Sequence, residues 1–396
     1  MRVFQAKLGL KVKKLITGML ERLIPQRRIE SYLFFWARFV VRIRKPFIIG
    51  ITGSVGKSTT TEMVAAVLMH RDAERIVGPV GYTLGNMNDD VGLPATLLRF
   101  DSFEIPYAYP GRLAILCLMP FRALRVVTGR YPKIMVLEFG TCWGGHLHRL
   151  VSLAPPNVSV VTTIGAAHLE RLKTLEGVVL EKSALVRAVP SSGLVVLGQG
   201  HDYVSQLEQM ASAPVTQVTG KGVELSRNIT LAVCRHLGIS DEVVSSALRD
   251  FKSPKGRLNR LEFVGLTVID DSYNANPLSM KLGLDTLAET GKQEYRRLAI
   301  LGGMGELGDE GRRYHQEVGV YARSRADVLI GVGDLSKHYN PDIWFDGSDA
   351  CANQIESLVR LDDCVLVKGS ASARMGRIVE KLREIADKRR GTRVHT

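Results

Sequence analysis

A glycine-rich segment with a lysine and a serine stands between an apolar run and a helical pattern, and its residue types suit phosphate binding. Backbone N–H groups of such a turn and the following helix N-terminus form a nest for an anion. Lys57 can reach the terminal phosphates, and Ser58 can ligate Mg²⁺. Ile51 stands where the full phosphate-loop pattern has its first glycine. The strand–loop–helix context still predicts a phosphate-binding loop, which comprises Gly53, Ser54, Val55, Gly56, Lys57, Ser58 and Thr59.

Two further residues that could do chemistry follow short apolar runs. Glu138 comes directly after residues 134–137, and His168 comes shortly after residues 158–161. In an open parallel sheet the carboxyl ends of the strands border the ligand crevice, where a carboxylate and an imidazole could bind a divalent cation. Taken alone, each is more often an ordinary loop residue, and Lys182, one helix further on, would be a solvated lysine.

Three polar segments in the second half of the chain also follow apolar runs. They are residues 270–277, 302–308 and 368–370. The first could serve only in turns and helix caps. The second lacks the spacing of a dinucleotide-binding fingerprint. Their shared position after strands indicates that all three face one crevice.

The elements that must position these residues are strands alternating with helices. The alternation starts at Pro46 and restarts after Arg257, with residues 252–257 as a hinge. Such alternation predicts parallel sheets with covered faces. We therefore expect an α/β protein with a basic helical arm (residues 1–45), a P-loop central domain with a parallel sheet (46–256) and a C-terminal Rossmann-like α/β domain (257–396). The predicted strands are residues 47–51, 134–137, 158–161, 266–269, 298–301, 328–331 and 365–367.

Composition excludes several classes of protein. The chain has 396 residues, of which 45% are hydrophobic and 23% charged, so it is neither disordered nor collagen-like. Its five cysteines are scattered without a CxxC pair, which indicates a reducing compartment and no disulfide scaffold. No run reaches the ~18 apolar residues of a membrane-spanning helix, and no secretory signal is evident.

The net charge of +13 is concentrated at the N-terminus. Residues 1–45 contain twelve Lys and Arg residues but only Glu21 and Glu30 as acids. The rest of the chain is close to neutral, so we expect no nucleic-acid binding by the protein as a whole. The arm has the pattern of two basic amphipathic helices separated at Pro25. Membrane contact, packing on the body, or binding of nucleic acid or another partner all fit it. Residues 103–131, apolar and cationic, could likewise face a membrane, form a lid or pack in the core.

Taken in order, these segments resemble the Mur ligases, most closely their D-alanyl-D-alanine-adding type. The resemblance runs from about Lys45 to Leu382. The order and spacing of the matching stretches make it specific. These stretches are residues 51–60, 85–94, 136–140, 166–170, 256–258, 270–276, 304–308 and 366–370.

The resemblance implies an ATP-dependent ligase that forms an amide through an acyl phosphate. It implies that Lys57, Glu138, His168 and Lys182 are catalytic, with Ser58 and Glu138 on one Mg²⁺. His168 and a carbamylated Lys182 would hold a second. The phosphate-loop residues would bind the nucleotide. The resemblance adds Asn228, Arg257, Asp271, Tyr273 and Asn274 for the nucleotide, and Asn86, Asn88 and Asn276 for the substrates.

We therefore predict addition of D-Ala-D-Ala, or a similar amine, to a UDP-muramoyl-peptide in peptidoglycan precursor synthesis. The arm occupies the place of the family's UDP-binding domain, which we expect to be absent. Two alternatives stay open: a related ligase with a membrane-associated or polymeric acceptor, and a P-loop nucleotide-binding protein without ligase activity. We expect a cytoplasmic monomer whose partners are small molecules. Residues 1–45 could in addition contact the inner face of the membrane peripherally.

Overall fold

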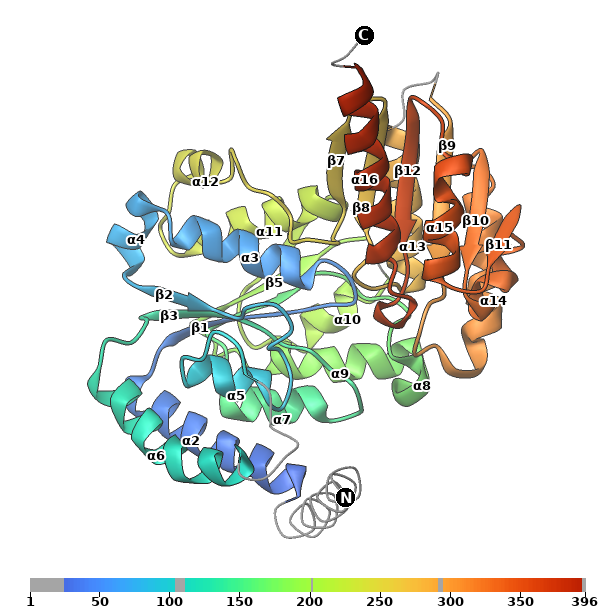
Figure 1. Ribbon diagram of the computed structural model, residues 1–396. Coiled ribbons are helices and arrows are strands. Elements are labelled where there is room, and N and C mark those ends of the chain that lie inside the picture. Colours follow the sequence, from blue (N-terminus) through green and yellow to red (C-terminus); the bar gives the residue numbers. More distant parts are fainter. Residues whose placement is uncertain (1–24, 104–110, 201, 291–294, 394–396) are drawn as a thin grey trace, which may run out of the picture.

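A computed structural model describes residues 25–103, 111–200, 202–290 and 295–393, which form two α/β domains, each built around a six-stranded sheet (Figure 1). In chain order the helices and strands of the central domain are α2 (Gln26–Arg44), β1 (Phe47–Thr52), α3 (Lys57–Leu68), α4 (Arg71–Val77), β2 (Val80–Tyr82), α5 (Gly92–Leu97), α6 (Gly111–Thr128), β3 (Ile134–Glu138), α7 (His146–Leu153), β4 (Val158–Val161), α8 (Leu169–Leu172), α9 (Leu175–Arg187), β5 (Leu194–Gly198), α10 (Val204–Gln209), β6 (Val215–Val218), α11 (Gly222–His236) and α12 (Asp241–Ala247). Those of the C-terminal domain are β7 (Asn259–Phe263), β8 (Leu266–Asp271), α13 (Pro277–Thr290), β9 (Arg297–Gly302), η1 (Gly308–Glu310), α14 (Gly311–Ala322), β10 (Val328–Val332), η2 (Asp334–Tyr339), β11 (Ile343–Phe345), α15 (Ser348–Leu358), β12 (Asp363–Lys368), η3 (Ala371–Ala373) and α16 (Gly376–Arg393).

The first sheet is wholly parallel, in the order β2-β3-β1-β4-β5-β6. Its central strands are buried on both faces because helices cover both. Ile49 and Ile51 of β1 pack toward α3 and α11, whereas Ile48 packs toward α7. Glu138 lies beside Ile51 in the register of β1 and β3. The carboxyl ends of these strands therefore bring the phosphate loop and Glu138 together.

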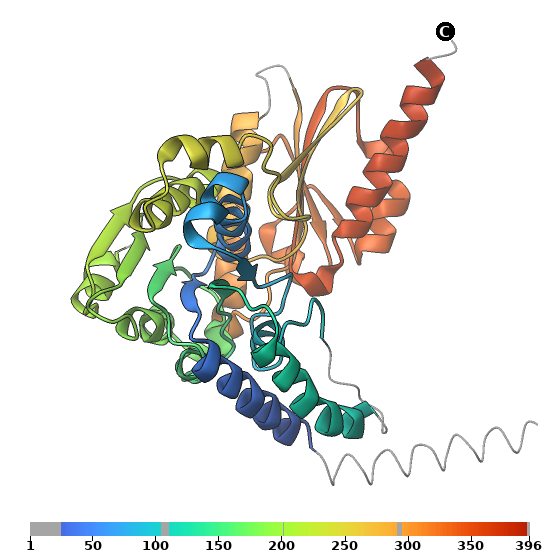
Figure 2. The ribbon, with the colours of Figure 1, turned by 90° about the vertical axis from the view of Figure 1, so that its left-hand side faces the viewer.

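The second sheet is mixed, in the order β11-β10-β9-β12-β8-β7. All its pairs are parallel except β7 and β8, which form an antiparallel hairpin at the sheet edge. Helices α13 and α14 cover the face toward the central domain, and α15 and α16 cover the other (Figures 1 and 2). The α/β fold class predicted from the sequence is confirmed, and each of the seven predicted strands is present.

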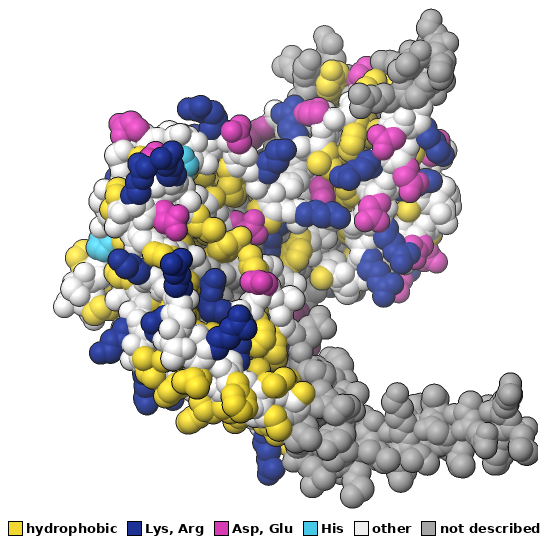
Figure 3. Space-filling view, turned by 60° about the vertical axis from the view of Figure 1, so that its left-hand side comes forward, with side chains coloured by type: hydrophobic (Ala, Val, Ile, Leu, Met, Phe, Trp, Pro, Cys, Tyr) yellow, Lys and Arg dark blue, Asp and Glu magenta, His cyan; other side chains and the backbone are white. Residues whose placement is uncertain are grey.

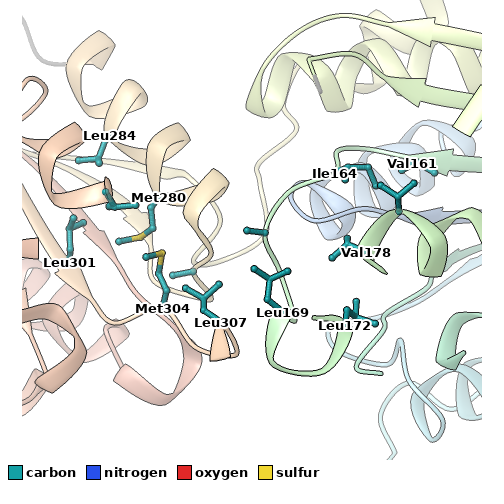
Figure 4. Packing of buried hydrophobic residues seen from close by; sticks show 14 of the residues in the cluster. Val161, Ile164, Leu169, Leu172, Val178, Met280, Leu284, Leu301, Met304 and Leu307 are labelled. Atoms are coloured by element: carbon teal, nitrogen blue, oxygen red, sulfur yellow. The ribbon is translucent and has the colours of Figure 1, made fainter. Parts of the chain in front are cut away.

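One hydrophobic cluster spans the two domains. Figure 4 shows Leu169 of α8 approaching Leu307, which follows β9, with Met304 beside it. Next to this contact the backbone N–H of Glu170 donates to the Glu306 carbonyl oxygen at 3.0 Å. The carboxyl ends of the two sheets are thereby held around one crevice.

Helix α2, the part of the basic arm that the structure describes, packs on the central domain. Its side chains Ile29, Leu33 and Ala37 are fully buried, in the same cluster as Ile48 of β1. The helix contacts α5, α6 and α7. The other helix predicted for the arm, within residues 8–23, lies outside the described residues. Division of the chain at residues 45 and 256 stays a prediction.

Replacing Leu33 with alanine tests whether α2 is part of this core. Leu33→Ala removes a fully buried side chain, so we expect it to lower the free energy of unfolding by about 2–5 kcal/mol. Phe35→Ala on the same helix is the matched control. Phe35 is 60% exposed, so a change within about 0.5 kcal/mol is expected. Denaturant unfolding followed by tryptophan fluorescence measures both, and equal effects of the two substitutions would contradict the packing.

Candidate active site

The phosphate loop joins β1 to α3 and is held against the loop after β4. Its Ser54 N–H donates to the Thr163 carbonyl oxygen at 2.8 Å, and its Val55 N–H donates to Thr163 Oγ1 at 2.9 Å. Thr162 Oγ1 in turn donates to the Val55 carbonyl oxygen at 2.5 Å. With the start of the loop fixed in this way, the first turn of α3 presents its unpaired N–H groups at the crevice, as an anion site requires.

Two glycines make this loop shape possible. Gly53 has φ of 148° and Gly56 has φ of 87°, in the region that glycine adopts without strain. A Cβ on Gly53 would lie 1.9 Å from Thr162 Oγ1. The loop therefore depends on the absence of a side chain at Gly53.

Glu138, at the end of β3, is 2% exposed and hydrogen-bonded through both carboxylate oxygens. Ser58 Oγ donates to Oε2 at 2.6 Å, and Asn88 Nδ2 donates to Oε1 at 2.7 Å. A hydroxyl and a carboxylate in contact are the oxygen donors that Mg²⁺ prefers. In the part of the chain that the structure describes, no group of three or more His, Cys, Asp or Glu side chains forms a metal cluster by itself.

Two lysines, the partly buried Lys57 and the fully buried Lys182, share one backbone acceptor. Lys57 Nζ donates to the Gly53 carbonyl oxygen at 2.9 Å, and Lys182 Nζ donates to the same oxygen at 3.1 Å. Burial lowers the pKa of Lys57, despite the favourable charge of Glu138. Burial together with the neighbouring Lys57 ammonium lowers the pKa of Lys182 to about 7. Lys182 is therefore an amine that can lose its charge near neutral pH.

His168 connects the central domain to the C-terminal domain. It precedes α8 in a left-handed conformation, φ 58°, and its Nδ1 is hydrogen-bonded to Glu306 Oε2. This hydrogen bond lowers the pKa of Glu306. The imidazole is thereby held at the crevice by a carboxylate from the other sheet.

The C-terminal domain contributes a second set of polar groups. The Arg257 guanidinium lies 4.0 Å above the centre of the Tyr273 ring. Lys368 Nζ, from the end of β12, lies 2.6 Å from Asp271 Oδ2 and donates to the Asn274 carbonyl oxygen at 2.9 Å. This pairing neutralises the buried Lys368 and fixes the chain around Asn274.

Asn276 joins the two sets directly. Its Nδ2 donates to the Ser54 carbonyl oxygen at 3.0 Å, and its Oδ1 accepts from the Ser279 N–H at 2.8 Å in the first turn of α13. Asn276 therefore ties the phosphate loop to the start of a helix in the other domain.

Both domains line a cavity of 220 Å³ at this crevice. A neighbouring hollow of 750 Å³ continues from Val55, Gly56 and Gly222 past Thr163 to Tyr321. The predicted site residues that line the cavity are Ser54, Val55, Gly56, Lys57, Thr59, Asn88, Glu138, His168, Arg257, Asp271, Tyr273, Asn274 and Asn276.

The remaining predicted residues lie at or beyond its edge. Gly53, Ser58 and Lys182 stand just behind the lining and bond to it as described. Asn86 is exposed on the loop before α5. Asn228 on α11 donates to the Thr219 carbonyl oxygen at 2.8 Å and lies outside the lining.

Sequence reasoning gave no role to several residues that line or support the cavity. Lys368 and Glu306 lie in segments that the resemblance quoted, but neither segment by itself indicates a partner. Thr141 and Cys142 also line the cavity. Both lie in the loop that follows β3, the strand that ends in Glu138, and this position in the sequence could have indicated that they lie near the site.

Two family models match this chain. Residues 51–108 and 122–236 match the Mur ligase middle domain, and residues 256–371 match the Mur ligase, glutamate ligase domain. Together they account for most of the sequence. The chain belongs to the Mur ligase family. This confirms the resemblance noted in the sequence and the prediction of an ATP-dependent ligase.

Several curated relatives of this Mur ligase carry the name UDP-N-acetylmuramoyl-tripeptide–D-alanyl-D-alanine ligase. The protein of that name from Mycobacterium tuberculosis (strain CDC 1551 / Oshkosh) is 28% identical, with 85% of this chain and 72% of the relative aligned. The one from Escherichia coli (strain K12) is 26% identical over 96% of this chain and 87% of its own length.

Solved structures show the same fold. The MurF ligase from Thermotoga maritima in complex with ADP aligns with a TM-score of 0.74 at 22% identity, covering 91% of this chain and 84% of that chain. Escherichia coli FolC in complex with DHPP and ADP aligns with a TM-score of 0.61 at 18% identity, and the alignment covers 90% of this chain and 93% of FolC. The two-domain arrangement of this Mur ligase is therefore found in both.

A substitution at Gly53 tests the phosphate loop. Because Gly53→Ala places a Cβ against Thr162 and disfavours the native φ, we expect its affinity for ATP to fall about tenfold or more. Gly347→Ala is the control, since Gly347 is extended and a Cβ there meets nothing within 4 Å. Isothermal titration calorimetry measures both proteins. Unchanged affinity in Gly53→Ala would contradict the predicted role of the loop.

Proposed function

We propose that this Mur ligase joins D-alanyl-D-alanine to the terminal carboxylate of a UDP-muramoyl-tripeptide, with ATP as the energy source, in peptidoglycan precursor synthesis. The observation that carries the proposal is the single cavity lined by the phosphate loop and Glu138 from one domain and by Arg257, Asp271 and Asn276 from the other. The name shared by the curated relatives, which align over 85% and 96% of the chain, supports this choice of substrates.

The phosphate loop would bind the triphosphate of ATP. The first turn of α3 and the Lys57 side chain lie at the same cavity, so the N–H groups at the start of this helix and the Lys57 ammonium can contact the β- and γ-phosphates together. Arg257 and Tyr273, stacked at the opposite wall, would hold the nucleoside side with Asp271 and Asn274. Asn228 is proposed as a further residue that contacts the base of the nucleotide.

Ser58 and Glu138 fit a magnesium site, because a hydroxyl and a carboxylate oxygen already lie 2.6 Å apart at the loop. His168 and a carbamylated Lys182 are proposed for a second ion. When bound, Mg²⁺ would neutralise negative charge on the oxygens of the transferring phosphoryl group.

The reaction proceeds in two balanced steps. The substrate carboxylate attacks the γ-phosphorus, which forms an acyl phosphate and releases ADP. The neutral amine of the dipeptide then attacks the acyl carbon, and phosphate and one proton from the amine leave as the amide forms. Asn86, Asn88 and Asn276 are proposed to position the substrates. Since Asn276 bonds to Ser54 across the crevice, the closed domains would also shield the acyl phosphate from water.

The enzyme would act as a cytoplasmic monomer on small-molecule substrates. Residues 1–45 are proposed to contact the inner face of the membrane, which the basic composition of this segment supports. A membrane-associated or polymeric acceptor is the alternative substrate.

Lys57→Ala tests the ligase chemistry. Loss of the charge that faces the phosphates should lower kcat at least about a hundredfold. The assay follows phosphate release from ATP with UDP-MurNAc-tripeptide, D-Ala-D-Ala, Mg²⁺ and bicarbonate, with mass detection of the product. Lys337→Ala, which removes an exposed lysine paired with Asp334, is the control. Failure of the wild type to form product while it still binds ATP would move the proposal to the alternative acceptor.

The pKa of Lys182 predicts a carbamate that depends on pH. CO₂ adds to the neutral amine with release of a proton. With a pKa of about 7, the neutral fraction rises between pH 6 and pH 8. We expect a ¹³C-bicarbonate NMR signal that grows over this range and is absent in Lys182→Arg, which stays charged. A wild-type protein without the signal at pH 8, and with activity independent of bicarbonate, would refute carbamylation.

A further inference from the structure

Helices α2 and α6 lie side by side and present large apolar side chains to solvent. On α2 these are Phe35, Phe39 and Ile43, and on α6 they are Leu118, Phe121 and Leu124. The most exposed are Phe121, at 71%, and Phe35, at 60%. Figure 3 shows hydrophobic side chains gathered over these two helices, with Lys and Arg side chains around them. We refer to these six residues as the α2–α6 face.

The α2–α6 face lies outside the hydrophobic core of the central domain. Both helices already bury an inner stripe, Leu33 and Ala37 on α2 and Ile115 and Met119 on α6, in the central-domain core. Residues 35, 39 and 43 recur every four positions on the outer side of α2, so they form a second stripe. Trp36 makes edge-to-face contacts with Phe35 and Phe39 and supports their rings. A contiguous exposed apolar patch of this kind marks an interaction surface.

The charged side chains that border the α2–α6 face indicate what kind of partner it binds. Arg27, Arg42 and Lys45 are exposed at the ends and edge of α2, and Arg125 and Arg130 are exposed on or just after α6. Glu30 is the sole acidic residue within the two helices, and it accepts a hydrogen bond from Gln26. An apolar surface with a cationic border and almost no acids complements a layer that is anionic outside and apolar beneath.

We propose that the α2–α6 face docks on the surface of a bilayer that contains anionic phospholipid. Its aromatic and aliphatic side chains would enter the headgroup boundary, and the bordering guanidinium and ammonium groups would contact lipid phosphates. No described helix is long and apolar enough to cross a bilayer. In the proposed docking, α2 and α6 would lie along the surface. The inference rests on the proposed membrane contact of residues 1–45 and extends it to α6.

Vesicle flotation of the full chain tests this docking. The wild type is expected to float with vesicles of equal parts phosphatidylglycerol and phosphatidylcholine. Flotation should weaken with phosphatidylcholine alone, and also when salt rises from roughly 0.1 M to 0.5 M. The double variant Phe35→Asp/Phe121→Asp should lower the partition constant about tenfold or more, because it removes two rings from the interface. Val320→Asp is the matched control, since Val320 is 77% exposed on α14 in the other domain.

A second double variant, Arg42→Gln/Arg125→Gln, tests the border. It should reduce binding to anionic vesicles and weaken the salt dependence, because two of the five bordering cations are removed. Thermal unfolding of each variant establishes that it is folded. Wild-type flotation of Phe35→Asp/Phe121→Asp would overturn the proposal. So would a wild-type dimer in lipid-free sedimentation equilibrium that this variant converts to a monomer, because the face would then bind a second copy of the chain.

The same variants separate this inference from the proposed ligase. Phe35→Asp/Phe121→Asp should keep the wild-type rate with soluble substrates while it loses vesicle binding. Lys57→Ala should float like the wild type while it loses ligase activity. Loss of flotation alone therefore reports on docking, and loss of product alone reports on the chemistry.

Discussion

The hydrogen bond from Asn276 Nδ2 to the Ser54 carbonyl oxygen sets the spacing on which the rest of the site depends. Ser54 belongs to a loop whose shape is fixed by Thr162 and Thr163, and Asn276 is fixed by the first turn of α13. The bond therefore joins two rigid pieces rather than two mobile loops. The contact of Leu169 with Leu307 and the backbone hydrogen bond beside it support the same spacing from the other end of the crevice. Groups from both sheets can act on one ligand only while these contacts hold.

Electrostatics makes this crevice more suitable for a polyanion than for water. Lys57 and Lys182 donate to one carbonyl oxygen, and their mutual repulsion adds to the cost of burying each charge. The negative charge of Glu138 offsets part of this cost of burying the lysine charges, but its two carboxylate oxygens already accept hydrogen bonds from Ser58 and Asn88. A phosphate group would supply the negative charge that Lys57 lacks, and that Lys182 lacks while its amine is protonated and not carbamylated.

The sequence was sufficient for the strands that carry the site because β1, β3, β4 and β8 are buried on both faces and contain mostly apolar residues in near-continuous runs. The edge strands were harder. β6 and β7 are half-exposed and carry polar residues, so neither has a strong apolar pattern. β7 also reverses direction through Gly265, φ 69°, which a reading based on strand–helix alternation does not anticipate.

The same distinction holds for the site. The phosphate loop is local, so its residue types and spacing reveal it. Glu306 is 138 residues from His168 in sequence, and Lys368 is 94 residues from Asn274. Such pairings arise only when the two sheets meet, and no local pattern encodes them.

Helix α2 ends at Arg44 and β1 begins at Phe47, and β1 leads directly into the phosphate loop. The outer face of α2 and the loop are therefore parts of one nearly continuous stretch of chain, braced along its length by the core. An enzyme resting on that face would have little freedom to tilt its crevice relative to the supporting plane. The crevice would then keep a constant distance from the membrane surface and a constant orientation to it. Reactants confined to the membrane would reach it by diffusion in two dimensions, whereas dissolved reactants would reach it by diffusion through solution.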